Sequence, residues 1–188
     1  IEPHKGCGVC DNCRDGLYTT CLNYGNATIG HRHYGFTNNG GYAQYAVNHI
    51  NSVYKIPDSM SFDTATLITT AGTALYGIRR MGGFEGGETV VVSGPGAVGL
   101  VSVALARVMG AGKIIITGTR KERLDIGLAL GADIAINVRK EDVIERVKDL
   151  TDGHGADVVL ECSGAPQAAT AAVEYTKMSG RLSIIGVQ

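Results

Sequence analysis

The chain has 188 residues, of which 44% are hydrophobic and 19% charged, a composition sufficient to form a buried core. Its net charge of -1 argues against nucleic acid or an anionic membrane as a partner. No apolar run approaches the roughly 18 to 20 residues that span a bilayer, and no basic segment precedes an apolar signal-like stretch. We therefore expect a cytoplasmic protein whose partners are small molecules and other subunits.

The first 55 or so residues combine cysteines, turn residues and short apolar stretches such as residues 42–47, a pattern typical of loop-rich β structure. The chain starts without methionine, and its last residues look like a buried strand with no helix after it. We therefore expect a fragment of a longer protein.

Four cysteines near the start of the chain have the spacing C-x2-C-x2-C-x7-C. Four thiolates fill the tetrahedral shell of a zinc ion and leave no position for substrate, so the cluster predicts a structural zinc site. The alternatives are an iron–sulfur cluster, a disulfide pair and a zinc ribbon that binds nucleic acid. Cys162 lies in an apolar run and is predicted to act only as a small buried hydrophobe. The predicted zinc ligands are Cys7, Cys10, Cys13 and Cys21.

A helical segment is predicted after residues 57–59, with Leu67, Ala71, Ala74 and Leu75 on one side. From Thr89 onward, apolar strands alternate with amphipathic helices. Strands that are apolar on both faces and joined by helices imply a parallel sheet covered on both sides. The predicted strands are residues 90–93, 114–117, 134–138, 158–162 and 182–185, and the predicted helices are residues 98–109, 121–130, 143–150 and 166–178.

A glycine pattern, G-x-G-x-x-G, lies between the first of these strands and its helix. In this context the first glycine allows a tight turn, the second lets the backbone approach a pyrophosphate, and the third lets the helix pack on the strand. The backbone amides at the start of the helix then interact favourably with the negatively charged phosphate. A structural glycine turn without a ligand is the alternative. The predicted cofactor-binding turn is Gly94, Pro95, Gly96, Ala97, Val98 and Gly99.

The residues after the second strand bear on the identity of the cofactor. An NAD site usually has Asp or Glu there, which binds the ribose hydroxyls and repels a 2′-phosphate. This chain has Gly118, Thr119 and Arg120 instead, and a guanidinium suits phosphate. Lys121 and Arg123 add positive charge, although an ordinary solvated helix start is the alternative. The sequence therefore favours NADP over NAD. The predicted cofactor-binding set is completed by Ser163, Gly164 and Gly186.

In this order the motifs resemble those of the zinc-containing medium-chain alcohol dehydrogenase family. The resemblance implies a partial catalytic, GroES-like domain over residues 1–60 with a structural zinc lobe. It also implies an α/β Rossmann domain with a doubly wound parallel sheet over residues 61–188, incomplete at its C-terminal end. The matching pieces are residues 7–13 with Cys21, 39–45, 56–58, 94–99, 131–133 and 161–164.

The activity implied by this resemblance is reversible oxidation of an alcohol to a carbonyl compound, with hydride transfer to a nicotinamide cofactor, in a homo-oligomer. In the family, the first catalytic zinc ligands precede the structural cysteines and are not in this chain. A later ligand position falls near Thr69 and Thr70, neither of which is a good zinc ligand. The resemblance therefore assigns no catalytic residue here, leaves a catalytic zinc open and implies that this chain alone is inactive.

Three further histidines, His31, His33 and His49, are not assigned to a metal site. A loop histidine more often lies at the surface, or contacts a metal ligand without binding the metal itself. Two alternative functions stay open: a zinc-independent reductase of the same superfamily that acts on enones or quinones, and a non-catalytic NADP-binding protein.

Overall fold

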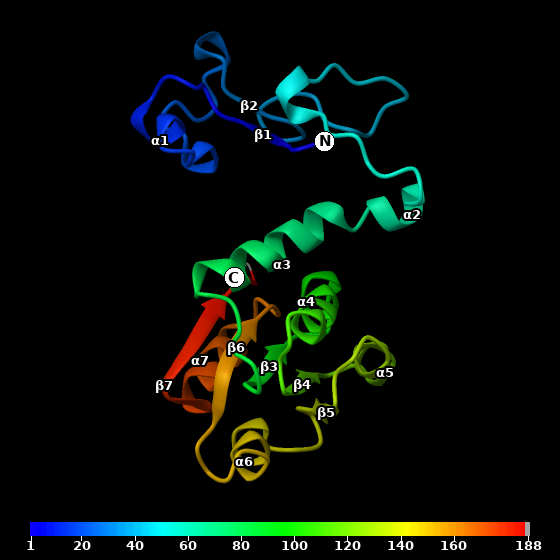
Figure 1. Cartoon of the computed structure of the whole chain (residues 1–188), viewed down its shortest axis with the longest axis vertical. Coiled ribbons are helices and arrows are strands. Elements are labelled where there is room, and N and C mark those ends of the chain that lie inside the picture. The colour runs from blue at the N-terminus through cyan, green and yellow to red at the C-terminus, as the bar shows by residue number, and fades with distance from the viewer. Residues whose placement is uncertain (187–188) are drawn as a thin grey trace. The chain divides into compact units, whose positions relative to one another are not determined.

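The computed structural model describes residues 1–186, and the chain divides into two compact units, Ile1–Ala65 and Thr66–Gln188. We call them unit 1 and unit 2; Figure 1 shows both. No helix among residues 1–186 combines the length and the apolar character needed to cross a membrane.

Unit 1 is rich in loops, as predicted, and its only sheet within the described residues has two short antiparallel strands. Residues 42–47 form no strand, contrary to the prediction, and Tyr42 and Tyr45 are exposed. Their backbone finds no strand partner among residues 1–65, so apolar alternation alone does not produce a strand there. The elements of unit 1 are β1 (His4–Lys5), α1 (Asp11–Arg14), η1 (Tyr18–Thr20), η2 (Ala27–Ile29), β2 (Arg32–His33), η3 (Ile50–Ser52) and α2 (Phe62–Ala65).

Unit 2 begins with the predicted helix, α3 (Ile68–Arg80), which buries Ala74 and Ile78. A five-stranded parallel sheet follows, in the order β5-β4-β3-β6-β7, with helices on both faces (Figure 1). The predicted doubly wound α/β fold is thus confirmed. The strands are β3 (Thr89–Ser93), β4 (Lys113–Gly118), β5 (Ile134–Asn137), β6 (Ala156–Glu161) and β7 (Thr176–Ile184), and the helices between them are α4 (Ala97–Val108), α5 (Lys121–Ala129), α6 (Val143–Asp149) and α7 (Pro166–Glu174).

The core of unit 2 has two layers, one on each face of the sheet. Since successive strand side chains point to opposite faces, Val90 and Val92 of β3 lie in one layer and Val91 lies in the other. Val103 of α4 packs in the first layer and Val147 of α6 in the second, so helices close both faces. All five side chains are fully buried, which explains why the strands have continuous apolar runs.

The last helix is shorter than predicted, because residues 176–178 belong to β7 rather than to α7. The apolar spacing continues past the helix end, but β6 offers this segment backbone partners. Ala156 pairs with Thr176, and the Ala156 amide donates to the carbonyl of Tyr175 at 2.8 Å. Pairing with β6 therefore overrides the local helical pattern.

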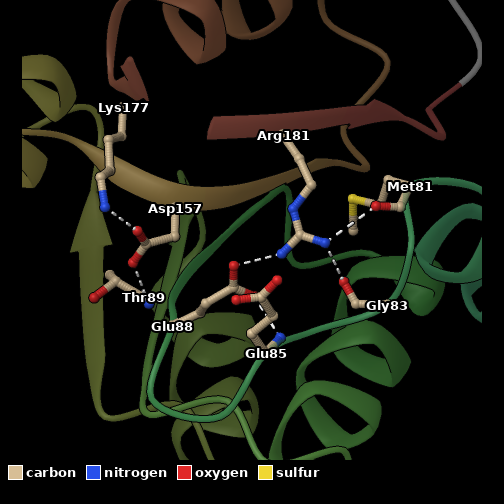
Figure 2. A network of polar contacts seen from close by, with 8 residues as sticks. All are labelled: Met81, Gly83, Glu85, Glu88, Thr89, Asp157, Lys177 and Arg181. Atoms are coloured by element: carbon tan, nitrogen blue, oxygen red, sulfur yellow. Dashed lines mark hydrogen bonds and ion pairs between the residues drawn. The ribbon is translucent and has the colours of Figure 1, made fainter. Parts of the chain in front are cut away.

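A polar network joins the amino end of the sheet to the segment between α3 and β3 (Figure 2). Arg181 of β7 donates to the carbonyls of Met81 and Gly83 at 3.1 and 2.8 Å, and it forms an ion pair with Glu88. The side chains of Arg181 and Glu88 are only 28% and 16% exposed. The network holds the segment that leads into β3, and β3 in turn leads into the glycine turn.

We expect Arg181→Ala to lower the free energy of unfolding of unit 2 by about 2 kcal/mol, because it leaves two carbonyls and a largely buried carboxylate without their donor. Urea denaturation measures this. Lys177→Ala is the matched control: its ion pair with Asp157 lies at the same edge, but the Lys177 side chain is 48% exposed. Equal losses for the two variants would contradict a special role for Arg181.

Candidate functional site

The four predicted zinc ligands converge in unit 1. Their sulfur atoms all lie within 4.8 Å of one another, and the Cys7–Cys13 and Cys10–Cys21 sulfur distances are 3.9 and 4.0 Å. A tetrahedral zinc ion with Zn–S bonds of about 2.3 Å places its sulfurs roughly 3.8 Å apart. The same distances far exceed the roughly 2.05 Å of a disulfide bond. The donor set therefore fits a closed zinc site.

The surroundings of the cluster support metal binding by thiolates. Asn23, which the sequence analysis did not single out, donates its side-chain amide to the Cys7 sulfur at 3.3 Å, and the Val9 amide also donates to it, at 3.4 Å. The hydrogen bond from Asn23 is the main cause that lowers the pKa of Cys7 to about 6, whereas burial raises the pKa of Cys13 to about 11. Thiolates this close repel one another, and a divalent cation among them offsets that repulsion.

Glycine is required beside the cluster at Gly6. A Cβ there would lie 2.6 Å from the Cys13 sulfur and 2.8 Å from Cβ of Tyr18. The cysteine spacing is therefore accompanied by a backbone that leaves room for the sulfurs, a feature that the spacing alone does not reveal.

Two of the three histidines are buried, so of the two expected placements the surface one is wrong for them. His31 is fully buried, and His33 stacks between His4 and Phe36 with ring centroids 3.7 and 4.1 Å away. Burial lowers the pKa of both His31 and His33, which favours neutral rings. His49 is exposed. Among residues 1–186, the one cluster of three or more potential metal-binding side chains consists of the four cysteines.

The glycine turn joins β3 to α4, and two of its glycines are required by the protein itself. Gly94 has a φ of +96°, and a Cβ there would lie 2.7 Å from the backbone of Ser163. A Cβ on Gly99 would overlap the carbonyl oxygen of Gly94. These contacts hold the turn close to both the helix and the end of β6.

Gly96 is different, because nothing in the protein requires it. It is the N-cap residue of α4, its φ of −83° suits any residue, and no atom lies within 4 Å of the position that a Cβ would occupy. No side chain caps this helix start, so its first amides have no side-chain acceptor. The residues present therefore fit a bound phosphate group, which needs free amides and a close approach to the backbone.

The other predicted cofactor-binding residues lie along the same carboxyl edge of the sheet. The strand order reverses between β3 and β6, and ligands of open α/β sheets bind at such a point. Ser163 and Gly164 follow β6, and Gly186 follows β7, with Gly164 beside it. Gly118 ends β4 on the other side of the turn, and a Cβ on it would overlap the ring of Pro95.

Arg120 lies exposed at the start of α5, in the N-cap position. It has no ion pair with an acidic side chain in the described part of the chain, residues 1–186. Lys121, by contrast, is paired with Asp125 at 2.6 Å. Of the adjacent pair Arg120 and Lys121, Arg120 is thus the one without an acidic partner among the described residues.

Comparison with known proteins agrees with this arrangement. Residues 1–58 match the alcohol dehydrogenase GroES-like domain, and residues 97–188 match the zinc-binding dehydrogenase domain. The chain belongs to the zinc-containing medium-chain alcohol dehydrogenase family.

Several individual relatives are similar to the chain over all or nearly all of its length. It is 35% identical to L-threonine 3-dehydrogenase of Pyrococcus abyssi and 33% identical to sorbitol dehydrogenase of Bacillus subtilis, in each case over 100% of this chain and 51% of the relative. A zinc-binding dehydrogenase from Sinorhizobium meliloti, in a structure described as bound to NADP, superposes with a TM-score of 0.88 at 28% identity, covering 98% of this chain and 52% of that one. The chain thus spans about half the length of the curated relatives it matches.

The later ligand position that the resemblance implies lies in the first turn of α3. Thr69 is exposed and Thr70 half-buried. One turn further, the Thr73 hydroxyl donates to the carbonyl of Thr69 at 3.2 Å. These hydroxyl groups provide no strong zinc ligand, in agreement with the sequence analysis.

One buried residue at the carboxyl edge of the sheet was missed by the sequence analysis. Glu161 ends β6 and is completely buried. The available signal was a carboxylate inside an otherwise apolar run, since such residues are almost never fully buried without a partner.

Proposed function

We propose that the whole protein is an NADP-linked alcohol or polyol dehydrogenase of the zinc-dependent type, acting on small-molecule alcohols or carbonyl compounds as a homo-oligomer. In this proposal residues 1–60 belong to its GroES-like catalytic domain and residues 61–188 to its Rossmann domain. The observation that carries the proposal is the open space over Gly96, at the point where the strand order reverses. The relatives named for threonine and sorbitol support an alcohol substrate, since both compounds have hydroxyl groups.

The chain's own residues have distinct roles in this proposal. The amides at the start of α4 bind the pyrophosphate, and Gly96 lets it approach. Cys7, Cys10, Cys13 and Cys21 hold a structural zinc ion that stabilises the surrounding loops. A bound nicotinamide cofactor supplies the acceptor for the hydride that leaves the alcohol carbon.

Three residues support NADP rather than NAD. Gly118 provides no carboxylate to repel a 2′-phosphate, and the ring of Pro95 fills the space that a side chain at Gly118 would need. Arg120 offers an unpaired guanidinium beside them. The structural neighbour described as bound to NADP supports the same choice.

A parallel fluorescence titration of the chain with NADPH and NADH tests this proposal. We expect tighter binding of NADPH, and we expect Arg120→Ala to weaken NADPH binding about tenfold while leaving NADH binding unchanged, because only NADPH has the 2′-phosphate. Lys121→Ala is the matched control, since Lys121 is already paired with Asp125. Preference for NADH would show that Arg120 is a solvated surface residue without a role in cofactor selection. Binding of neither cofactor would contradict the proposal.

A zinc-independent reductase is the second candidate, and Thr69 and Thr70 favour it, because they replace a good zinc ligand. Assays of the whole protein separate the two candidates. Oxidation of polyols with NADP that is lost on chelation of zinc supports the dehydrogenase. Reduction of enones or quinones with NADPH that resists chelation supports the reductase.

A further inference from the structure

The carboxylate of Glu161 is buried without a cation. Glu161 is 0% exposed, and none of the ion pairs among residues 1–186 includes it. A buried carboxylate of this kind persists only where hydrogen bonds replace water. Its position at the end of the strand next to β3 places it under the proposed cofactor site.

Neutral donors from the following turn surround the carboxylate. The Ser163 amide donates to Oε1 at 2.8 Å, the Ser163 hydroxyl donates to the same oxygen, and the Gly164 amide donates to Oε2 at 3.4 Å. All three donors are matched by side-chain oxygens that accept hydrogen bonds. The carboxylate therefore determines the conformation of the Ser163–Gly164 turn, in which Gly164 has a φ of +69°.

This turn contacts the segments after both neighbouring strands. The Ser163 backbone lies so close to Gly94 that a Cβ on Gly94 would approach it to 2.7 Å. On the other side, a Cβ on Gly186 would lie 2.8 Å from Oε2 of Glu161. The Glu161 backbone carbonyl also accepts from the amides of Ile185 and Gly186 at 2.8 and 2.9 Å. Glu161 thus links the ends of β3, β6 and β7.

We propose that Glu161 is a positioning residue for the nicotinamide half of the cofactor site: it holds the Ser163–Gly164 turn against Gly94, and it does not itself touch the cofactor. The inference rests on the proposed function. Dinucleotide-binding sheets consist of two mononucleotide-binding halves that meet where the strand order reverses. Here β3, β4 and β5 form the adenosine half, and β6 and β7 belong to the other half.

Glu161→Gln tests this, because it keeps the shape of the side chain but replaces one acceptor oxygen by an NH2 donor that faces the donors of the turn. Two ligands are titrated: NADPH, which occupies both halves, and 2′,5′-ADP, which occupies only the adenosine half. We expect NADPH binding to weaken roughly tenfold and 2′,5′-ADP binding to change by less than about twofold. Glu174→Gln, at the exposed end of α7, is the matched control and leaves both affinities unchanged.

Equal weakening of both ligands would overturn the proposal, since it would show a merely structural role, and so would unchanged NADPH binding. If Glu161→Gln does not fold, Ser163→Ala provides the same comparison, because it removes only the hydroxyl donor, and roughly threefold weaker NADPH binding with unchanged 2′,5′-ADP binding is expected. Failure of the unaltered chain to bind either ligand would overturn the proposed function itself, an outcome distinct from a failure confined to the variants.

Discussion

Cys21→Ser is expected to lower the zinc content from about one ion per chain to near zero and to unfold unit 1. Unit 1 has only two short strands and a few helical turns, so the metal has to replace the large core that it lacks. In zinc-finger peptides metal binding contributes about 10 kcal/mol or more to folding. Elemental analysis gives the zinc content, and amide hydrogen exchange shows which residues lose protection.

The fifth cysteine provides the matched control. Cys162 lies at the far end of the sequence in unit 2, where burial raises the pKa of its thiol to about 12, so it is a poor source of thiolate. Cys162→Ala should keep the full zinc content. Iron in place of zinc, or normal protection of residues 1–65 in the metal-free protein, would contradict the prediction.

Gly96→Ala and Gly99→Ala are expected to differ sharply in their effects on stability and on cofactor binding. No atom lies within 4 Å of a Cβ at Gly96, so Gly96→Ala should leave the melting temperature nearly unchanged but weaken cofactor binding at least about tenfold, because the methyl group blocks the pyrophosphate. A Cβ at Gly99 would overlap the Gly94 carbonyl oxygen, so Gly99→Ala should cost about 2 kcal/mol or more of stability. Thermal denaturation and NADPH titration measure the two effects separately.

A glycine far from the turn serves as the control for this pair. Gly41 also has open space around it and needs no positive φ, so Gly41→Ala should change neither stability nor cofactor affinity. If Gly96→Ala binds NADPH as tightly as the unaltered chain, the space over Gly96 is not the phosphate site.

Much of the fold could be predicted from the sequence, because each feature depends on neighbours in the chain. Continuous apolar runs such as residues 90–92 identify buried parallel strands, since their side chains must be apolar on both faces. The limits of this reasoning lie at residues 42–47 and 176–178. In both segments the conformation depends on whether a neighbouring strand offers backbone partners, and local spacing does not contain that information.

By itself, the sequence determined the strand and helix order of unit 2, the glycine turn and the four candidate zinc ligands, because spacing along the chain encodes them. Only the tertiary structure showed the contacts behind the expected roles of the three glycines: open space at Gly96, and neighbouring atoms that require glycine at Gly94 and Gly99. It also revealed Glu161, whose partners belong to a turn packed between strands that are distant in sequence. The contacts of the three glycines and of Glu161 cannot be read from the sequence, because they depend on which atoms from separate strands come within a few ångströms of each other.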